Sequence, residues 1–209
     1  AGTTEKDGIP TGWKLVKLGD VCEFLDSKRK PIKEADRSLR ISGKSANELY
    51  PYYGANGQVG WIDGYLFDEP TILLAEDGGH FGSKERPIAY KVQGRYWVNN
   101  HAHVLKPKDN IDFDFLFNSI AIRPDVGNLV QGATRAKLNL STAKRISIPF
   151  PPLEEQKRIA GILNKAEGIK KLREEADKKT EELIPAIFHE MVGSRIKNGE
   201  GLPDGWKWV

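Results

Sequence analysis

Three prolines within four residues, Pro149-Phe150-Pro151-Pro152, divide this 209-residue chain into two parts of different character. Such a segment continues neither a helix nor a central strand, because proline lacks the backbone N–H and has a fixed φ angle. From Leu153 to Val192 helix breakers are almost absent, and Glu154 and Glu155 stand in the first turn, where the helix dipole favours negative charge. The sequence therefore predicts a domain boundary at residues 149–152 followed by one long helix.

Apolar residues of the long helix follow a heptad pattern with position a at Ile159. The predicted seam and its flanking stripe comprise Ile159, Ile162, Ala166, Ile169, Leu172, Ala176, Leu183 and Ile187. Such a stripe can pack on its own domain or pair with another long helix. Forty residues give a helix of about 60 Å, about twice the diameter of a small domain, so we expect much of it to extend beyond residues 1–152 and pair as a coiled coil.

Three positions interrupt the heptad pattern. Arg173 and Thr180 weaken the seam midway, where a polar residue selects register and orientation at a cost in stability. Pro185 removes one backbone hydrogen bond, so we expect it to kink the helix or to end its regular part.

Before the prolines, short apolar stretches alternate with Gly, Pro and Asn clusters, a pattern typical of a strand-rich domain. The predicted strands are Gln58–Ile62, Thr71–Ala75, Ile88–Val92, Trp97–Val98, His103–Leu105 and Arg145–Ile148. The predicted helices are Phe113–Ile122, capped by Asp112 or Asp114, and Ser141–Arg145. The expected fold class is α+β: a strand-rich domain over residues 1–152, a coiled-coil-forming helix over 153–193, and a linker over 194–209.

The same nine-residue motif occurs near both ends of the sequence. The pattern G-[IL]-P-x-G-W-K-x-V occupies residues 8–16 and again residues 201–209. Locally it predicts a Pro-Gly turn that leads into an edge strand. Its recurrence indicates one unit of a tandem duplication, followed by the beginning of a second unit.

Composition excludes several classes of protein. The net charge of +3 does not by itself argue for nucleic acid, and the excess lies in residues 1–152, which hold 21 Lys and Arg against 18 Asp and Glu. The single cysteine, Cys22, forms neither an internal disulfide nor a zinc cluster. No apolar run approaches the length of about 18 residues that a membrane span needs, and no signal peptide is visible at the start, so we expect a cytoplasmic protein without a membrane partner.

Polar loops between the predicted strands carry groups that suit DNA. Arg can read guanine, Gln or Asn can read adenine, and Lys or Thr can hold phosphates. The candidate residues are Gln131, Thr134, Arg135 and Lys137 in one small-residue loop, Lys84 and Arg86 after a glycine-rich turn, Lys28, Arg29 and Lys30 in a basic run, and His101. For each residue taken alone, a solvated surface side chain is the competing interpretation.

Catalytic chemistry has weaker support. Glu76 and Asp77 follow an apolar strand, as carboxylates do in some nucleases, and His101 and His103 would point to one side of a strand. No third ligand at metal-site spacing accompanies them, so we expect structural or DNA-facing roles and no bound metal. The glycine loop and the Asn/Asp-Pro-Pro-aromatic motif of an adenine methyltransferase are missing, so methyl transfer is not assigned.

Four segments together resemble the DNA-specificity (S) subunits of type I restriction-modification systems. They are GWKLVKLGDV (residues 12–21), YGANG (53–57), GATRAKL (132–138) and IPFPPLEEQKRI (148–159). The resemblance implies a target recognition domain over residues 1–152 and a conserved spacer helix over 153–193. Members of this family usually hold two such units, whose helices pair antiparallel, whereas this sequence holds one unit and the beginning of another. It is therefore either a fragment of a longer subunit or a half-subunit that forms a homodimer through its helix.

The same resemblance implies a non-catalytic subunit that binds one half of a bipartite double-stranded DNA target. It would recruit methyltransferase (modification) subunits and, through them, restriction subunits. No cofactor is expected on this chain, whereas the partner subunits would use S-adenosylmethionine, ATP and Mg. Two alternatives stay open: a coiled-coil assembly module that does not read DNA, and a metal-dependent nuclease built on Glu76, Asp77 and the histidines.

Overall fold

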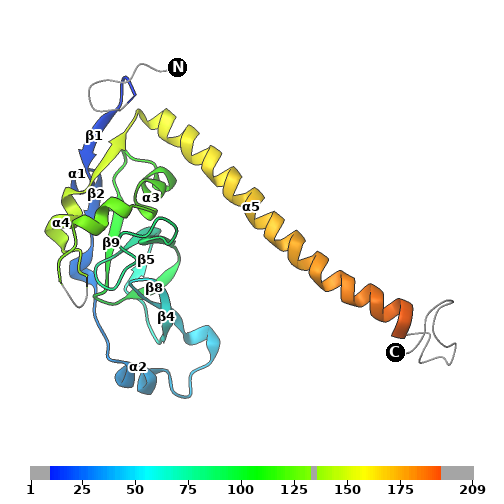
Figure 1. Cartoon of the computed structure of the whole chain (residues 1–209). Coiled ribbons are helices and arrows are strands. Elements are labelled where there is room, and N and C mark those ends of the chain that lie inside the picture. The colour runs from blue at the N-terminus through cyan, green and yellow to red at the C-terminus, as the bar shows by residue number, and fades with distance from the viewer. Residues whose placement is uncertain (1–9, 133–135, 194–209) are drawn as a thin grey trace. The chain divides into compact units, whose positions relative to one another are not determined.

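The computed structural model describes residues 10–132 and 136–193, with side chains described as far as Met191 (Figure 1). Contacts divide the chain into a first unit that ends at Ala160 and a second unit that begins at Gly161. This division falls eight residues beyond the expected boundary at Pro152. The reason is that the first two turns of the long helix bury Gln156 and Ala160 in the first unit.

Strands of the first unit form a ribbon and two four-stranded sheets. In the ribbon, β1 (Lys14–Lys17) pairs antiparallel with β10 (Ser147–Phe150). The first sheet is antiparallel, in the order β2 (Cys22–Phe24), β9 (Ala102–Pro107), β6 (Thr71–Ala75) and β7 (Ala89–Val92). The second sheet has the order β4 (Gly57–Ile62), β3 (Tyr50–Gly54), β8 (Arg95–Val98) and β5 (Phe67–Asp68). It is mixed, because β3 and β8 run parallel.

Short helices connect and cover these sheets. They are α1 (Leu18–Val21), α2 (Glu34–Ile41), α3 (Phe113–Ala121) and α4 (Leu140–Arg145), with tighter turns at η1 (Asp26–Lys28), η2 (Ala46–Glu48) and η3 (Pro124–Asn128). The long helix α5 (Leu153–Phe188) follows the proline segment. The predicted cap of α3 is present, since the Asp112 carboxylate accepts a 2.9 Å hydrogen bond from the Phe115 N–H. In the same way, Asn139 caps α4 by accepting from the Thr142 N–H at 2.9 Å.

Six predicted strands correspond to β4, β6, β7, β8, β9 and β10, and the expected edge strand after the Pro-Gly turn is β1. Gly12 has φ +84° in that turn, a conformation that favours glycine. β10 begins at Ser147, two residues later than predicted, because Arg145 ends α4. Two elements were not predicted: β3, whose Pro51 and Gly54 resemble turn residues, and α2, which buries no side chain.

The core of the first unit lies on both faces of β6, whose five residues are all buried. Ile72 and Leu74 belong to one apolar cluster with α3 residues such as Leu116, whereas Leu73 belongs to another with Tyr96 of the second sheet. Successive side chains of a strand point to opposite faces, so alternation within one apolar strand serves both clusters. The first sheet is therefore packed between helices and the second sheet.

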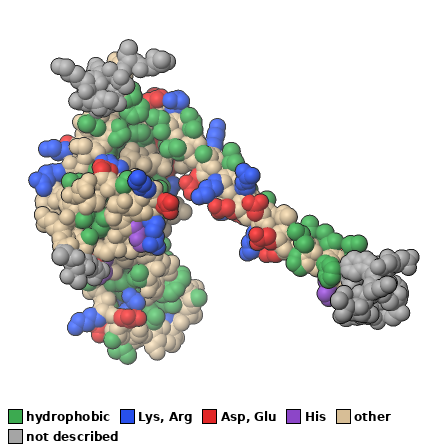
Figure 2. Space-filling model, in the orientation of Figure 1, with side chains coloured by type: hydrophobic (Ala, Val, Ile, Leu, Met, Phe, Trp, Pro, Cys, Tyr) green, Lys and Arg blue, Asp and Glu red, His purple; other side chains and the backbone are tan. Residues whose placement is uncertain are grey.

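Helix α5 contains 36 residues and is about 54 Å long. Ile159, predicted as a seam residue, packs partly buried against the core of the first unit. From Gly161 to Met191 every side chain is exposed in the single chain, including Ile169 and Leu172 at 67% each. Figure 2 shows apolar side chains gathered near the end of α5, beyond a stretch rich in charged groups.

The α-helix continues through Pro185 and ends at Phe188, where a π-helical turn, η4 (His189–Gly193), follows. The regular part of the helix thus extends three residues past the proline. Pro185 lacks only its own N–H, and the loss of one hydrogen bond does not interrupt the ladder on either side. None of the described helices combines the length and the apolar character that crossing a bilayer requires.

Candidate nucleic-acid interface

Four loops meet at one end of the two four-stranded sheets, and we call them the loop cluster. They comprise residues 54–57, 76–88, 99–101 and 131–138, of which 133–135 lie outside the described residues. The register explains the meeting, because β3 and β8 are parallel and end together, while the end of β6 pairs with the beginning of β9. The loops 54–57, 76–88 and 99–101 therefore leave the sheets at one end, and an isolated bridge between Asp77 and Lys137 joins the segment before α4 to them.

Hydrogen bonds join the four loops to one another. Asn56 donates from Nδ2 to the carbonyl oxygen of Gly78 at 2.9 Å. The Glu76 N–H donates to the His101 carbonyl at 2.8 Å, and the Leu138 N–H donates to the Glu76 carbonyl at 2.7 Å. The loop that follows β6 thus connects the hairpin turn, the β8–β9 turn and the segment before α4.

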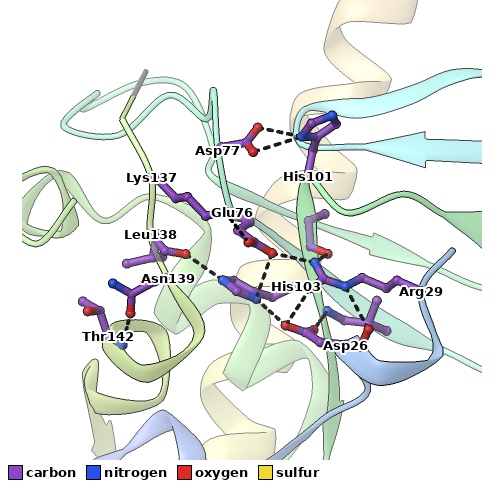
Figure 3. A network of polar contacts seen from close by, with 12 residues as sticks. Asp26, Arg29, Glu76, Asp77, His101, His103, Lys137, Leu138, Asn139 and Thr142 are labelled. Carbon is purple, nitrogen blue, oxygen red and sulfur yellow. Dashed lines mark hydrogen bonds and ion pairs between the residues drawn. The ribbon is translucent and has the colours of Figure 1, made fainter. Parts of the chain in front are cut away.

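A buried histidine lies beneath the loop cluster (Figure 3). His103 on β9 is fully buried, its Nδ1 lies 2.6 Å from Asp26 Oδ2, and its Nε2 lies 2.8 Å from the Leu138 carbonyl oxygen. A carbonyl oxygen only accepts, so Nε2 donates to Leu138, while Nδ1 shares a hydrogen bond with the Asp26 carboxyl group. Through these two bonds His103 ties the segment before α4 to the first sheet.

Arg29 completes the network around His103. Its Nη1 donates to Glu76 Oε2 at 2.7 Å and to the Ala102 carbonyl at 2.6 Å, while its Nη2 lies 3.2 Å from Asp26 Oδ2. Lys137 approaches the other oxygen of Glu76, with Nζ 3.1 Å from Oε1. The carboxylates of Asp26 and Glu76 thus meet two cations, Arg29 and Lys137, and the His103 ring, which satisfies the requirement that buried charges be paired and hydrogen-bonded.

Asp26, Glu76 and His103 also offer three atoms within 4.8 Å of one another, a spacing compatible with a metal ion. The hydrogen bonds of the network argue against that use, because both nitrogens of His103 are engaged and the Arg29 guanidinium contacts both carboxylates. Burial by itself would raise the pKa of the Asp26 carboxyl. Hydrogen bonds from His103 and the Val104 N–H, together with the nearby positive charges, outweigh burial and hold this pKa below its usual value of 3.8.

Five of the candidate DNA-binding residues lie in the loop cluster. Lys84 and Arg86 are exposed in the loop after β6. Gln131 and Lys137 face each other in an antiparallel bridge, with reciprocal backbone hydrogen bonds of 3.0 and 2.7 Å. His101 lies with Nδ1 2.8 and 3.0 Å from the two carboxylate oxygens of Asp77. Residues that the sequence separates by more than 50 positions are therefore brought to one surface.

The other candidates are placed differently. The side chain of Arg29 is directed into the network described above, which favours a structural role over a phosphate contact. Lys28 and Lys30 have exposed side chains, and the Lys30 carbonyl accepts a hydrogen bond from Trp97 Nε1. Thr134 and Arg135 lie outside the described residues, as does the second copy of the terminal repeat.

Three residues near this surface were not predicted as site residues: Asp26, Arg37 and Asn99. Asp26 contacts His103 across 77 positions of sequence, and no local pattern indicates such a pairing. Arg37 lies on the short helix α2, which buries no side chain. The polar run Asn99-Asn100-His101 after an apolar strand was the available signal, and we assigned only its histidine to DNA.

The family described as the type I restriction modification DNA specificity domain matches residues 10–181 of this chain. The chain belongs to this specificity family. S.HindORF215P of Haemophilus influenzae, described as a type I restriction enzyme specificity subunit, is 35% identical over 158 residues. That match covers 76% of this chain and 38% of the relative, so the chain spans less than half the length of the curated protein that it resembles.

Two solved structures of type I systems share the fold of this specificity chain. One comes from work on complex assembly and conformational transition of the type I system and has a TM-score of 0.60 at 18% identity, covering 89% of this chain and 46% of the other. The S subunit from M. genitalium has a TM-score of 0.58 at 18% identity, covering 78% and 40%. The predicted α+β class with a long helix is thereby confirmed, and so is the resemblance to S subunits. The relatives are named specificity subunits, in agreement with the prediction of a non-catalytic component.

Proposed function

We propose that this chain reads one half of a bipartite double-stranded DNA target as the specificity component of a type I restriction-modification complex. The observation that carries the proposal is the family match over residues 10–181, which includes both the loop-bearing unit and most of α5. In the loop cluster, Lys84, Arg86 and Lys137 supply cations for phosphates, while Gln131 supplies an amide for a base edge. The mixture of cations and amides suits DNA better than a small-molecule substrate.

The exposed stripe of α5 supports pairing of two copies. Ile162, Ile169, Leu172, Leu183 and Ile187 are each exposed in the single chain. Burial of apolar surface stabilises association by about 25 cal/mol per Å² removed from water, so the stripe favours a partner helix. Two copies joined antiparallel through α5 would carry two loop clusters related by a two-fold axis. Such a dimer reads an inverted repeat with a fixed spacer, because protein symmetry imposes symmetry on the DNA.

In this proposal the chain brings methyltransferase subunits, and through them restriction subunits, to the target. Those subunits would supply the chemistry that depends on S-adenosylmethionine, ATP and Mg, and this chain would bind none of the three. The nuclease alternative is less favoured, because the carboxylate of Glu76 is paired with Arg29 and Lys137, and that of Asp77 with His101. Carboxylates paired in this way are poor ligands for a catalytic metal.

Selection of bound duplexes from a random DNA library tests the proposal directly. The full chain is used with and without the cognate methyltransferase subunit, and bound duplexes are sequenced. We expect a split inverted motif with a constant spacer, whereas a single unsplit half-site would support DNA reading without the dimer. Absence of enrichment with the partner present would overturn the proposal and favour the assembly module, for which weak, salt-insensitive DNA binding is expected.

A further inference from the structure

A pocket of about 310 Å³ lies beside the loop cluster, between α2 and the turn that follows β8. Its polar lining residues are Glu34, Arg37, Tyr52, Asn99, Asn100 and His101. Asn99, Asn100 and His101 form the β8–β9 turn and thus belong to the loop cluster. The pocket is therefore a recess at the edge of the surface to which we assign DNA binding.

Arg37 is held in this pocket by stacking. Its guanidinium carbon lies 4.6 Å from the centre of the Tyr52 ring, a cation–π geometry. Gly60, the cross-strand partner of Tyr52, also lies close to this guanidinium, since a side chain there would meet three guanidinium atoms at 3.2–3.4 Å. Among the described residues Arg37 forms no ion pair, whereas Arg29 and Arg40 each pair with a carboxylate. The Arg37 guanidinium is thus held in position by the Tyr52 ring and not by an ion pair with a described carboxylate.

Tyr52 provides a rigid platform for this guanidinium. The ring is buried, and its hydroxyl accepts from the Ile32 N–H at 3.0 Å and donates to the Ile32 carbonyl at 3.3 Å. The segment before α2 is therefore fixed to the second sheet. A cation on such a platform loses little conformational entropy when it binds a ligand.

Asn99 adds a second oriented donor. It is only 8% exposed, its N–H donates to the Tyr53 carbonyl, and its Oδ1 accepts from the His101 N–H at 2.8 Å. Because Oδ1 must accept that bond, the orientation of the amide is defined and Nδ2 remains a donor. No protein acceptor for Nδ2 is present in the described part of the chain. This nitrogen lies close to Gly54, where an added Cβ would approach it to 3.3 Å.

We propose that Arg37 and Asn99 bind one phosphate group of the DNA backbone in this pocket. This inference rests on the proposed DNA-reading function. Both groups donate hydrogen bonds, and a guanidinium matches phosphate oxygens in a bidentate manner. Phosphates project from a duplex, whereas base edges lie within the grooves. A recessed set of donors is therefore accessible to a phosphate and not to a paired base.

Glu34 makes the proposal testable in both directions, because it is the one carboxylate among the residues that line the pocket. Its negative charge opposes a phosphate that Arg37 attracts. Removal of the Arg37 charge should therefore lower the affinity for DNA, and removal of the Glu34 charge should raise it. A general loosening of the fold would instead weaken binding in both variants.

Binding of the full chain to its selected duplex and to a scrambled duplex, measured by fluorescence anisotropy over a range of salt concentrations, tests the site. Arg37→Gln should lose affinity about tenfold on both duplexes and lower the slope of log K against log salt by about 0.9, the value for one phosphate contact. Glu34→Gln should tighten binding on both. Arg95→Gln is the matched control, since it makes the same charge change at the beginning of β8, the end opposite Asn99, and should have a smaller effect.

Three outcomes would overturn the phosphate assignment. The first is an equal effect of Arg37→Gln and Arg95→Gln, and the second is weaker binding by Glu34→Gln. The third is a loss of affinity by Arg37→Gln on the selected duplex alone, which would indicate base reading. Thermal unfolding of each variant checks the fold. If Arg37→Gln is unfolded, Arg37→Lys, which keeps the charge without the fork, and Glu34→Gln decide the question. Failure of the wild-type chain to bind any duplex would instead overturn the proposed function, and with it the proposed phosphate-binding site.

Discussion

His103 illustrates how a single residue can hold a loop in place. Both of its ring nitrogens are hydrogen-bonded, one to the Asp26 carboxyl group and one to the Leu138 backbone carbonyl. The side chain is fully buried, so these bonds replace all of its contacts with water. The position of Lys137 next to Leu138 thus depends on a hydrogen-bond network that lies inside the first unit.

Asp26→Asn tests the importance of this network and of the Asp26 charge within it. The substitution removes the ionised partner of His103 and Arg29, so we expect a loss of about 3 kcal/mol in the free energy of unfolding at pH 7. The pKa of Asp26 is lowered in the folded chain, so its contribution is complete above the unfolded pKa of about 3.9 and is lost as pH falls through the lower folded pKa. Urea unfolding between pH 7 and pH 3 measures both effects.

The acid-dependent part of the stability should be smaller in Asp26→Asn than in the wild type. Asp68→Asn is the control, because Asp68 forms an exposed pair with Arg95, and such pairs contribute little. If Asp26→Asn and Asp68→Asn unfold at the same urea concentration at pH 7, the network does not stabilise the fold.

At the scale of elements, Gln156 links α5 to the first unit. Its side chain is fully buried, Oε1 accepts from the Asp112 N–H at 2.8 Å, and Nε2 donates to the Pro151 carbonyl at 2.9 Å. One amide therefore fastens the first turn of the long helix to the beginning of α3 and to the proline segment. This is a physical reason for a glutamine in the LEEQ sequence that follows the prolines.

Gln156→Ala leaves a buried N–H and a buried carbonyl without partners, so we expect a loss of about 1–3 kcal/mol in unfolding free energy. Thiol labelling of Cys22 provides the measurement. Burial of this thiol, opposed weakly by Lys108, raises its pKa to about 12, so it reacts only when the first unit opens. Lys157→Ala, at the next and exposed position, should label at the wild-type rate. Equal labelling of both variants would contradict the role of Gln156.

At the scale of the whole molecule, the two units bury apolar side chains differently. The first unit encloses its core on both faces of β6, whereas α5 from Gly161 onward exposes its apolar stripe in the single chain. Exposed apolar stripes of this extent are a feature of surfaces that bind partners. Assembly is therefore expected to involve the second unit.

Ile169→Asp tests assembly through α5. The substitution places a charge in the predicted seam, so we expect the chain to sediment near its 23.4 kDa monomer mass while the wild type sediments near twice that mass. Lys171→Gln changes the charge equally but lies at the outward heptad position, and it should behave like the wild type. Urea unfolding of the first unit should be unchanged in both. A wild-type chain that is monomeric at all concentrations would contradict pairing through this helix.

Much of the fold could be predicted because local signals were strong. Local sequence indicates the conformation of the prolines at 149–152, of the breaker-free stretch after them and of the apolar strand β6, because each depends on residues near in sequence. α2 was not predicted because it is a short, mostly polar helix that buries no side chain, and β3 was not predicted because it carries proline and glycine. Propensity is a weak guide where tertiary contacts decide.

The amino-acid sequence by itself determined the two-part organisation, the strand-rich first unit, the long helix and the family, since each depends on composition, periodicity or local motifs. Only the tertiary structure decided which polar residues share a surface. It directed Arg29 into a buried network with Asp26 and His103, gathered Lys84, Arg86, His101 and Lys137 in one loop cluster, and placed Arg37 beside Asn99. The physical reason is that charge pairing and hydrogen bonding act over a few ångströms in space, at any separation along the chain.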